Sequence, residues 1–281
     1  MSKKRKTLIA SGLLLVAMGA GYLSYTVASS ARAKQSIKDL QSIAYRETTA
    51  AQVTEAQVTE PPTTEAPETV SQPETTAPVV TTKEKDPYVS PIDFEALWEI
   101  NPDIYAWIEI PGTDVSYPIL QHPTDNDYYL THTPEGVEDA PASIFTHNVN
   151  SKDFTDFNTL IYGHKWNDGT MFGKLHYYRD EQYLKEHQMI RIYLPDRELR
   201  YTIFATVVYD DRLITSYYDF TDTESCRAFL RSIYGNRDMN TIILLEPRAT
   251  VDDRLITLST CIKWQEHNRY LVVAVLTNEI T

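Results

Sequence analysis

Cysteine and positive charge are both scarce in this sequence, and the two shortages exclude several classes of protein. Only Cys226 and Cys261 occur among 281 residues, which is too few for a framework of disulfide bonds. The formal net charge is −13, whereas a protein that binds nucleic acid needs a basic face for the phosphates. No CxxC or HExxH spacing is present either. We therefore expect no cofactor, no metal ion and no nucleic-acid partner.

Long apolar segments are absent except near the N-terminus. Residues 1–6 read MSKKRK and are predicted to be a basic cytoplasmic tail. Residues 7–31 carry no charge, and as a helix they would extend roughly 37 Å, enough for a ~30 Å hydrocarbon core. Because basic flanks stay in the cytoplasm, we expect a single-pass protein of the cell membrane with an extracellular C-terminal part. A cleaved signal peptide is the alternative, although the apolar segment is long for one.

Residues 32–86 lack the composition of a folded core. The stretch 47–82 contains 11 Thr, 6 Glu and 5 Pro but no aromatic residue, Lys or Arg. Such a segment cannot bury enough apolar surface to offset the entropy lost on ordering. We expect residues 32–86 to form a disordered extracellular spacer between the membrane and a folded domain.

Aromatic and β-branched residues become frequent from residue 87, which predicts one folded domain over residues 87–281. This domain holds 16 Lys and Arg against 30 Asp and Glu, so the excess negative charge lies within it. Its length of about 195 residues fits a single domain.

Turn residues divide the domain into short strands and a few helices. A helix is predicted after the cap Asp93, and a second one after a capping box from Thr221 to Glu224, ending at Gly235. The expectation is a mainly β fold with added helices, in the form of a β-barrel. The predicted strands cover residues 104–110, 115–120, 143–145, 159–162, 189–194, 198–209, 242–245, 255–260 and 270–276.

The two cysteines fall in different contexts. Cys226 lies on the apolar face of the second predicted helix, where a free cysteine behaves as a small hydrophobic residue. Cys261 lies at the end of an apolar strand, a place where scaffolds present reactive groups. A nucleophilic thiolate needs a proton carrier and a group that stabilises negative charge on the attacked carbonyl oxygen.

His164 and Arg269 are the candidates for these two roles. His164 follows an apolar strand and Gly163, so it should emerge at a strand end as Cys261 does. Arg269 begins the strand after a predicted hairpin loop at residues 263–268, and strand pairing would bring it beside Cys261. The other six histidines lie in polar or loop-like contexts.

These motifs together resemble the sortases, a family of transpeptidases from Gram-positive bacteria. TLSTC at residues 257–261 fits the family's TLxTC signature, and NTLIYGH at 158–164 fits its motif of a strand before the histidine. Class B members are similar to the longer pattern: residues 94–121, DNDYYLTH at 125–132 and DGTMFGKL at 168–175. The resemblance implies a sortase-type β-barrel with N-terminal helices and a helix inserted before the strand that bears Cys261.

The resemblance also implies roles for particular residues. Cys261 would be the nucleophile, His164 the general acid and base, and Arg269 the group that stabilises the substrate carbonyl and oxyanion. The residues implied to bind substrate are Ser259 and Thr260 beside the nucleophile, and Asn126 and Leu130 in DNDYYLTH. Residues 209–235 would form one wall of the groove, and class B resemblance does not imply a metal.

The function that follows is a membrane-anchored cysteine transpeptidase. It would cleave the C-terminal sorting signal of exported proteins, form a thioester, and transfer the protein to an amine of a lipid-linked peptidoglycan precursor. A sortase that polymerises pilins through a pilin lysine is the alternative. A papain-like peptidase fits less well because its cysteine precedes its histidine, whereas His164 precedes Cys261. A receptor without activity would leave the motifs as coincidence.

Overall fold

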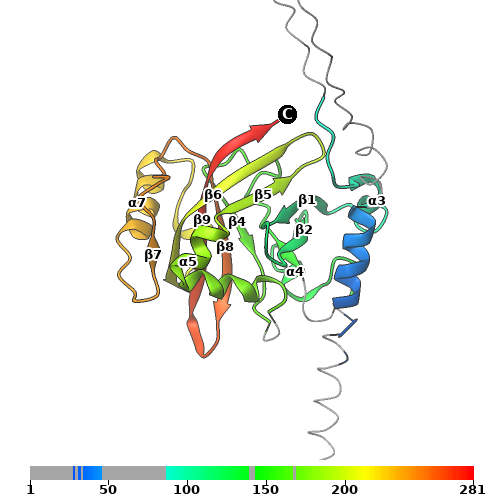
Figure 1. Ribbon diagram of the computed structural model, residues 1–281, viewed down its shortest axis with the longest axis horizontal. Helices are drawn as coiled ribbons and strands as arrows, with labels where there is room; N and C mark the ends of the chain where they lie inside the picture. Colours follow the sequence, from blue (N-terminus) through cyan, green and yellow to red (C-terminus); the bar gives the residue numbers. More distant parts are fainter. Residues whose placement is uncertain (1–27, 29–30, 33, 46–86, 139–142, 167–168) are drawn as a thin grey trace, which may run out of the picture.

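The computed structural model describes residues 28, 31–32, 34–45, 87–138, 143–166 and 169–281 (Figure 1). The predicted tail at residues 1–6 lies outside the described residues, as do most of the segment 7–31 and most of the spacer 32–86. The predicted localisation as a single-pass membrane protein is contradicted. In the described ranges no helix has both the length and the apolar character that a bilayer crossing requires. Such a helix needs about 20 predominantly apolar residues.

The described strands form one sheet that closes into a barrel (Figure 1). Its order is β5-β1-β2-β3-β4-β8-β9-β6, and pairing of β5 with β6 closes the ring, while β7 extends the sheet beyond β6. The expectation of a mainly β fold with added helices is therefore confirmed. The strands are β1 (Ile104–Glu109), β2 (Ser116–Leu120), β3 (Ile144–Phe145), β4 (Asn158–Tyr162), β5 (Met189–Tyr193), β6 (Glu198–Asp210), β7 (Ile242–Ile243), β8 (Leu255–Ile262) and β9 (Gln265–Ile280).

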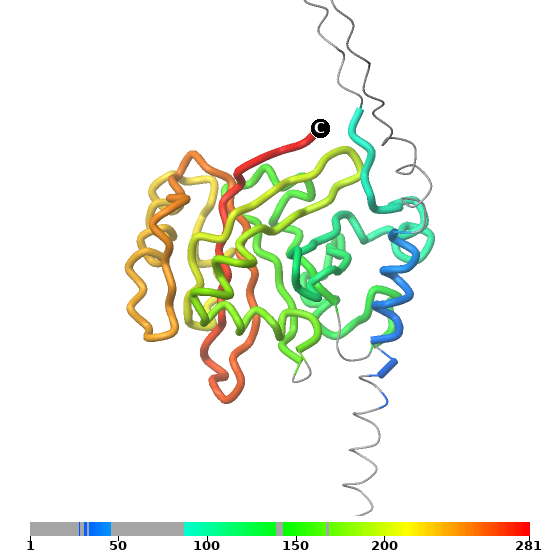
Figure 2. The backbone as a smooth tube through the Cα atoms, viewed as in Figure 1, coloured from blue at the N-terminus to red at the C-terminus, as the bar shows by residue number. Residues whose placement is uncertain are grey.

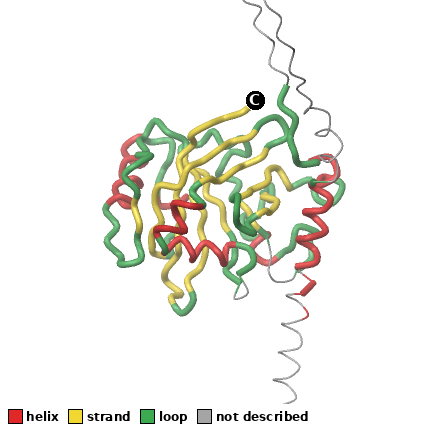
Figure 3. The backbone as a smooth tube through the Cα atoms, in the orientation of Figure 1, coloured by secondary structure: helices red, strands yellow, loops and turns green. Residues whose placement is uncertain are grey.

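Helices lie around the outside of the strands (Figure 3). One of them, α7, stands between β6 and β8 in the chain, which confirms the predicted helix before the strand of Cys261. The helical elements with defined bounds are α3 (Phe94–Trp98), α4 (Tyr128–Thr131), the 3-10 helix η1 (Phe172–Arg179), α5 (Glu181–Glu186), α6 (Ile214–Tyr217) and α7 (Thr223–Tyr234).

The caps of α3 and α7 follow from local hydrogen bonding. Asp93 caps α3 as predicted, since its carboxylate accepts from the backbone N–H of Ala96. The predicted capping box of α7 is wrong by one residue, because the cap is Asp222 and not Thr221. The hydroxyl of Thr221 instead donates to Asp219 in the preceding turn, at 2.6 Å.

Strands β6, β8 and β9 are buried on both faces, which explains why they read as nearly continuous apolar runs. Their inner face joins the barrel core, with Ile203, Leu258 and Val272 completely buried. Their outer face packs under α7, where Phe229 and Cys226 are buried. The core assignment of Cys226 is thus confirmed.

The opposite side of the barrel is covered by a helix over residues 34–44, drawn in blue in Figure 2. Leu40 and Ala44 on this helix are buried against a cluster that includes Trp107 on β1. The carbonyl of Ala44 also accepts a hydrogen bond from the backbone N–H of Asp93 at 2.9 Å. Residues 34–45 therefore pack on the barrel, while the predicted domain boundary at residue 87 stays a prediction.

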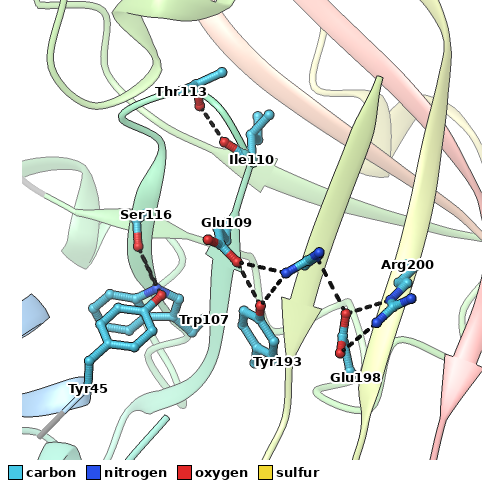
Figure 4. A network of polar contacts seen from close by, with 10 residues as sticks. Tyr45, Trp107, Glu109, Ile110, Thr113, Ser116, Tyr193, Glu198 and Arg200 are labelled. Carbon is cyan, nitrogen blue, oxygen red and sulfur yellow. Dashed lines mark hydrogen bonds and ion pairs between the residues drawn. The ribbon is translucent and has the colours of Figure 1, made fainter. Parts of the chain in front are cut away.

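A row of charged and polar groups crosses strands β1, β5 and β6 where the barrel closes (Figure 4). The hydroxyl of Tyr193 donates to Glu109 at 2.6 Å, and Arg200 forms an ion pair with Glu198 at 2.7 Å. Arg191 lies between the two carboxylates, at 3.7 Å from Glu109 and 3.6 Å from Glu198. Opposite charges on adjacent strands favour this pairing over others, so the row helps to define the register of the closing strands.

Candidate functional site

Strands β4 and β8 run parallel and end at the same edge of the sheet. Their register runs from Asn158 opposite Leu255 to Tyr162 opposite Ser259, and the N–H of Gly163 donates to the Ser259 carbonyl at 3.1 Å. His164 follows immediately on one strand, and Cys261 lies two residues beyond Ser259 on the other. The structure thus brings together two residues that are far apart in the chain.

Gly163 is required by close packing at this point, not by a special backbone angle. A Cβ atom added here would lie 2.5 Å from Ile144 Cδ1 and 2.5 Å from Phe172 Cδ2, distances that real Cβ atoms essentially never show. The reason is that η1 approaches the end of β4 closely and leaves room only for hydrogen.

Arg269 is the direct register partner of Cys261 across the antiparallel pair β8–β9. The predicted hairpin loop at 263–268 is wrong in length, because β9 already begins at Gln265 and the turn is formed by Lys263 and Trp264. Trp264 adopts a positive φ of 65°, as a turn this tight requires. Cys261 and Arg269 are adjacent as expected, although the loop is shorter than predicted.

A pocket of about 220 Å³ opens beside Cys261. Six of the seven predicted site residues line it, and the exception is Asn126. Asn126 instead accepts a hydrogen bond from the backbone N–H of Asn148 at 2.7 Å, so its amide connects two loops. The lining residues are Asp127, Leu130, Phe145, His147, Tyr162, Gly163, His164, Asp210, Asp211, Arg212, Leu213, Ile214, Ser259, Thr260, Cys261, Arg269 and Leu271.

The imidazole of His164 is oriented by a backbone carbonyl that the sequence did not reveal. Its Nε2 lies 2.7 Å from the carbonyl oxygen of Leu130 in α4. A carbonyl only accepts, so Nε2 carries the proton and donates it to Leu130. In the neutral ring Nδ1 is then the basic nitrogen.

The pocket wall predicted from residues 209–235 is shorter than expected. Residues 210–214, between β6 and α6, line the pocket, but α7 does not. Tyr217 and Tyr218 lie outside it as well. Tyr217 is exposed, and Tyr218 is buried with its hydroxyl 2.9 Å from that of Tyr209.

Two histidines near the site were missed or left open by the sequence. His147 lines the pocket and stacks on Tyr162 with ring centroids 4.5 Å apart, and burial lowers the pKa of this imidazole. It follows β3 as His164 follows β4, and that position at a strand end was a usable signal. No comparable signal in the sequence marks His176, because the groups that it contacts lie on β8 and β9.

His176 contacts the backbone of the candidate nucleophile from η1. Its Nε2–H donates to the Cys261 carbonyl at 3.0 Å, and its ring stacks on Tyr270 with centroids 5.1 Å apart. Burial is the main cause that lowers the pKa of His176 to about 4, so the ring is neutral near pH 7. A neutral imidazole can hold this donor bond without adding charge beside Cys261.

Acidic residues near the site do not form a metal centre. Asp127, Asp210 and Asp211 line the pocket, but Asp210 pairs with Arg212 at 2.5 Å and Asp211 lies 3.1 Å from His267. Among the residues with described positions, no group of three His, Cys, Asp or Glu side chains could hold a metal ion.

Three comparisons relate the chain to known proteins. A family model described as "Sortase domain" matches residues 108–277. Sortase B of Listeria monocytogenes is 34% identical over 169 residues, which cover 59% of this chain and 65% of that protein, or slightly less than two thirds. Sortase B of Staphylococcus aureus is 32% identical over 171 residues, covering 60% of this chain and 67% of the relative.

Solved structures of sortase B are also similar to this chain in fold. A 2.0 Å crystal structure of S. aureus sortase B is similar with a TM-score of 0.60 and 30% identity, covering 68% of this chain and 89% of that one. A S. aureus sortase B–substrate complex gives a TM-score of 0.59 at 30% identity, with 66% and 84% covered. Sortase B from B. anthracis in complex with AAEK1 gives 0.57 at 30%, also with 66% and 84% covered.

Proposed function

Because the chain belongs to the sortase family, we propose that it is a cysteine transpeptidase with Cys261 as its nucleophile. The resemblance of its motifs to class B is supported by relatives and structures that are sortase B proteins. The catalytic domain would be residues 87–281. One observation carries the proposal: exposed Cys261, its register partner Arg269 and His164 all line a single pocket.

The first half of the reaction is cleavage of a peptide bond. The Cys261 thiolate attacks the carbonyl carbon of the scissile bond, and negative charge develops on the carbonyl oxygen. Arg269 stabilises this oxyanion. His164 gives a proton to the leaving amine, the C–N bond breaks, and the acyl group stays on Cys261 as a thioester.

Arg269 keeps donors available for the oxyanion. Its Nη1 donates to the carbonyls of Glu266 and Asn268 within its own hairpin, at 2.9 Å and 3.1 Å. Its Nε and Nη2 have no hydrogen-bond partner among the residues that the structure covers. The guanidinium is thereby held by one nitrogen, while two others can face substrate.

His164 moves the proton through Nδ1 in this scheme. Since Nε2–H is engaged by the Leu130 carbonyl, Nδ1 is the nitrogen that exchanges a proton with the amine. The carbonyl of Leu130 can accept the Nε2–H in both charge states of the ring, so the orientation of His164 is kept while Nδ1 gains and loses its proton. Leu130 would therefore act on catalysis through its backbone and on substrate through its side chain.

The proposed substrate is an exported protein with a C-terminal sorting signal. Apolar residues of the pocket such as Phe145, Leu213 and Leu271 suit an extended peptide with apolar side chains. Ser259, Thr260 and Leu130 would contact this peptide, whereas Asn126 would act through the loop of Asn148. The proposed acceptor is an amine of a lipid-linked peptidoglycan precursor, which attacks the thioester and releases Cys261.

Cleavage of a library of sorting-signal peptides, followed by mass spectrometry, tests the proposal. We expect a covalent acyl-enzyme on Cys261, and no cleavage by Cys261→Ala or His164→Ala. Cys226→Ala is the matched control and should cleave at the wild-type rate because Cys226 is buried under α7. Cleavage by Cys261→Ala would exclude the proposed nucleophile. Covalent ladders formed from purified pilins would identify the alternative acceptor.

A further inference from the structure

Three positively charged side chains lie near Cys261 and outside the lining of the pocket. Lys165 follows His164 after the end of β4, Arg179 ends η1, and Lys263 lies in the β8–β9 turn, two residues after Cys261. None of these three side chains lines the pocket. They come from three separate parts of the chain, each next to an element that pairs with or packs against β8.

Contacts between η1 and the two strands hold Arg179 in this position. The η1 helix packs against both β8 and β9, and His176 donates to the Cys261 carbonyl at 3.0 Å. One turn further, the Arg179 guanidinium lies 5.3 Å from the ring centroid of Tyr270. Tyr270 is the register partner of Thr260, the residue before Cys261. Arg179 is therefore fixed close to the nucleophile by ordered neighbours.

Lys165 is held at the start of the same helix. A β-bridge pairs it with Met171, directly before η1. Burial lowers the pKa of Lys165, the charges of Lys263 and Arg179 lower it further, and Cys261 acts in the opposite direction. Lys165 thus lies within the electrostatic field of the other two cations and of Cys261.

No carboxylate within the described ranges forms an ion pair with Lys165, Arg179 or Lys263. The lack of pairing is unexpected in a domain that has 30 acidic residues against 16 basic ones. Glu266, on the same hairpin, is exposed and uses its backbone carbonyl to hold Arg269. Clustered like charges repel one another, and an anionic ligand relieves that repulsion.

We propose that Lys165, Arg179 and Lys263 bind a carboxylate of the acceptor, so that the preferred acceptor is an amine whose own residue bears a free carboxylate. This inference rests on the proposed function, because it concerns the second half of that reaction. The acyl chain occupies the pocket on one side of Cys261, and the acceptor enters from the cationic side. Ammonium and guanidinium groups donate charge-assisted hydrogen bonds to carboxylates, which gives the selectivity.

The transfer step balances without any further reactant. The acceptor nitrogen attacks the thioester carbonyl carbon, a C–N bond forms, and the C–S bond breaks. The electron pair of the C–S bond stays on the Cys261 sulfur, and the amine proton passes to Nδ1 of His164. The bound carboxylate stays unchanged and only positions the amine.

Two acceptors that differ in one group test this inference. N-acetyl-lysine has a single reactive amine and a free carboxylate, whereas N-acetyl-lysinamide has the same amine and no carboxylate. With a fixed sorting peptide, we measure the ratio of transfer product to hydrolysis product for each acceptor by mass spectrometry. We expect wild type to prefer the carboxylate form by about tenfold, since each exposed charge pair contributes a few-fold.

The variant Lys165→Gln/Arg179→Gln/Lys263→Gln should lose this preference. The preference is a ratio within each variant, so a change in overall rate cancels. The matched control is Lys152→Gln/Lys185→Gln/Arg227→Gln, which removes the same charge at sites away from Cys261 and should behave as wild type. Lys263→Gln alone, in an exposed turn, should lower the preference by a few-fold without endangering the fold.

The possible outcomes separate the two proposals. If wild type forms the acyl-enzyme but uses both acceptors equally, the inference is overturned and the proposed function stands. If the triple variant keeps the preference that wild type shows, the three cations do not bind the carboxylate and the inference is overturned. If no acyl-enzyme forms with any sorting peptide, the proposed function is wrong, and the inference that rests on it is wrong as well.

Discussion

Cys261 and Arg269 are paired directly across the β8–β9 hairpin, so their side chains project from the same face of the sheet. The turn that joins their strands consists of only Lys263 and Trp264. A register shift separates this turn from the pair, since Ile262 pairs with Gln265 and Cys261 with Arg269. The pairing of the two strands therefore holds the proposed nucleophile beside its proposed charge-stabilising partner.

Replacement of Arg269 should affect the reaction far more than the fold. For Arg269→Gln we expect kcat/KM for a sorting peptide to fall on the order of 10²–10³-fold, the usual loss for one oxyanion donor. For Arg269→Lys, kcat/KM should lie between the values of wild type and Arg269→Gln, because lysine keeps the charge and loses the planar set of donors. Steady-state kinetics measure this, with Arg227→Gln on α7 as the control. A change of less than about threefold for Arg269→Gln would contradict the assigned role.

The two thiols should differ strongly in reactivity in the folded protein. Cys261 is exposed, whereas Cys226 is buried, burial raises the pKa of Cys226, and its Sγ donates to the Phe220 carbonyl at 3.4 Å. A maleimide should therefore add once to wild type and to Cys226→Ala, and not to native Cys261→Ala. Intact mass before and after denaturation measures this. Fast labelling of native Cys261→Ala would show that Cys226 is accessible.

Gly163→Ala should disturb both stability and activity. The added Cβ would collide with Ile144 and Phe172, and overpacking of this kind costs about 1–3 kcal/mol. The displacement would also move His164, so cleavage should fall together with stability. Gly136→Ala is the control: its φ of +74° makes alanine unfavourable, but its nearest contact would be the Tyr128 hydroxyl at 3.6 Å. It should cost about 1 kcal/mol through the backbone alone and keep its activity.

Asn150 should be important for stability because it satisfies buried backbone groups beside β4. Its Oδ1 accepts from the Leu160 N–H at 3.0 Å, and its Nδ2 donates to the Asn158 carbonyl at 3.0 Å. Asn150→Ala leaves these groups unpaired and should lower the free energy of unfolding by about 1–3 kcal/mol. Chemical denaturation measures the loss, and exposed Asn278→Ala on β9 should stay within about 0.5 kcal/mol of wild type. Equal stability of the two variants would contradict this account.

His176 should make stability depend on pH. Burial first, then the charges of Arg179 and Lys165, hold its pKa at about 4, whereas the unfolded chain has an ordinary imidazole near 6.5. Between these values the unfolded state binds more protons, so the stability contribution is complete above about pH 6.5 and is lost as the pH falls towards 4.

The matched variant for this prediction is His176→Gln, which keeps an N–H donor for the Cys261 carbonyl and does not titrate. Melting temperatures of wild type and variant, measured from pH 7 to pH 4, should show wild type losing a few degrees relative to the variant. A difference that stays constant over this range would mean that His176 is not buried as a neutral ring.

Local patterns were sufficient to predict most of the elements. The strands of the barrel read as apolar runs because β6, β8 and β9 are buried on both faces, and the spacing of apolar residues in α7 identified Cys226 as core. Prediction failed at this level in two places. Asp222 displaced Thr221 as the cap of α7, and β9 extended through polar residues to Gln265.

The sequence by itself determined which residues are proposed to carry the chemistry: a cysteine in TLSTC, a histidine at a strand end and an arginine in the next strand. Only the tertiary structure decided how they are supported. The Leu130 carbonyl orients His164, His176 holds the backbone of Cys261, and Asn126 turns away from the pocket towards Asn148. These contacts join groups 22 to 85 residues apart in the chain. No periodicity of the sequence encodes such distances, because they depend on how the barrel closes and how η1 packs across it.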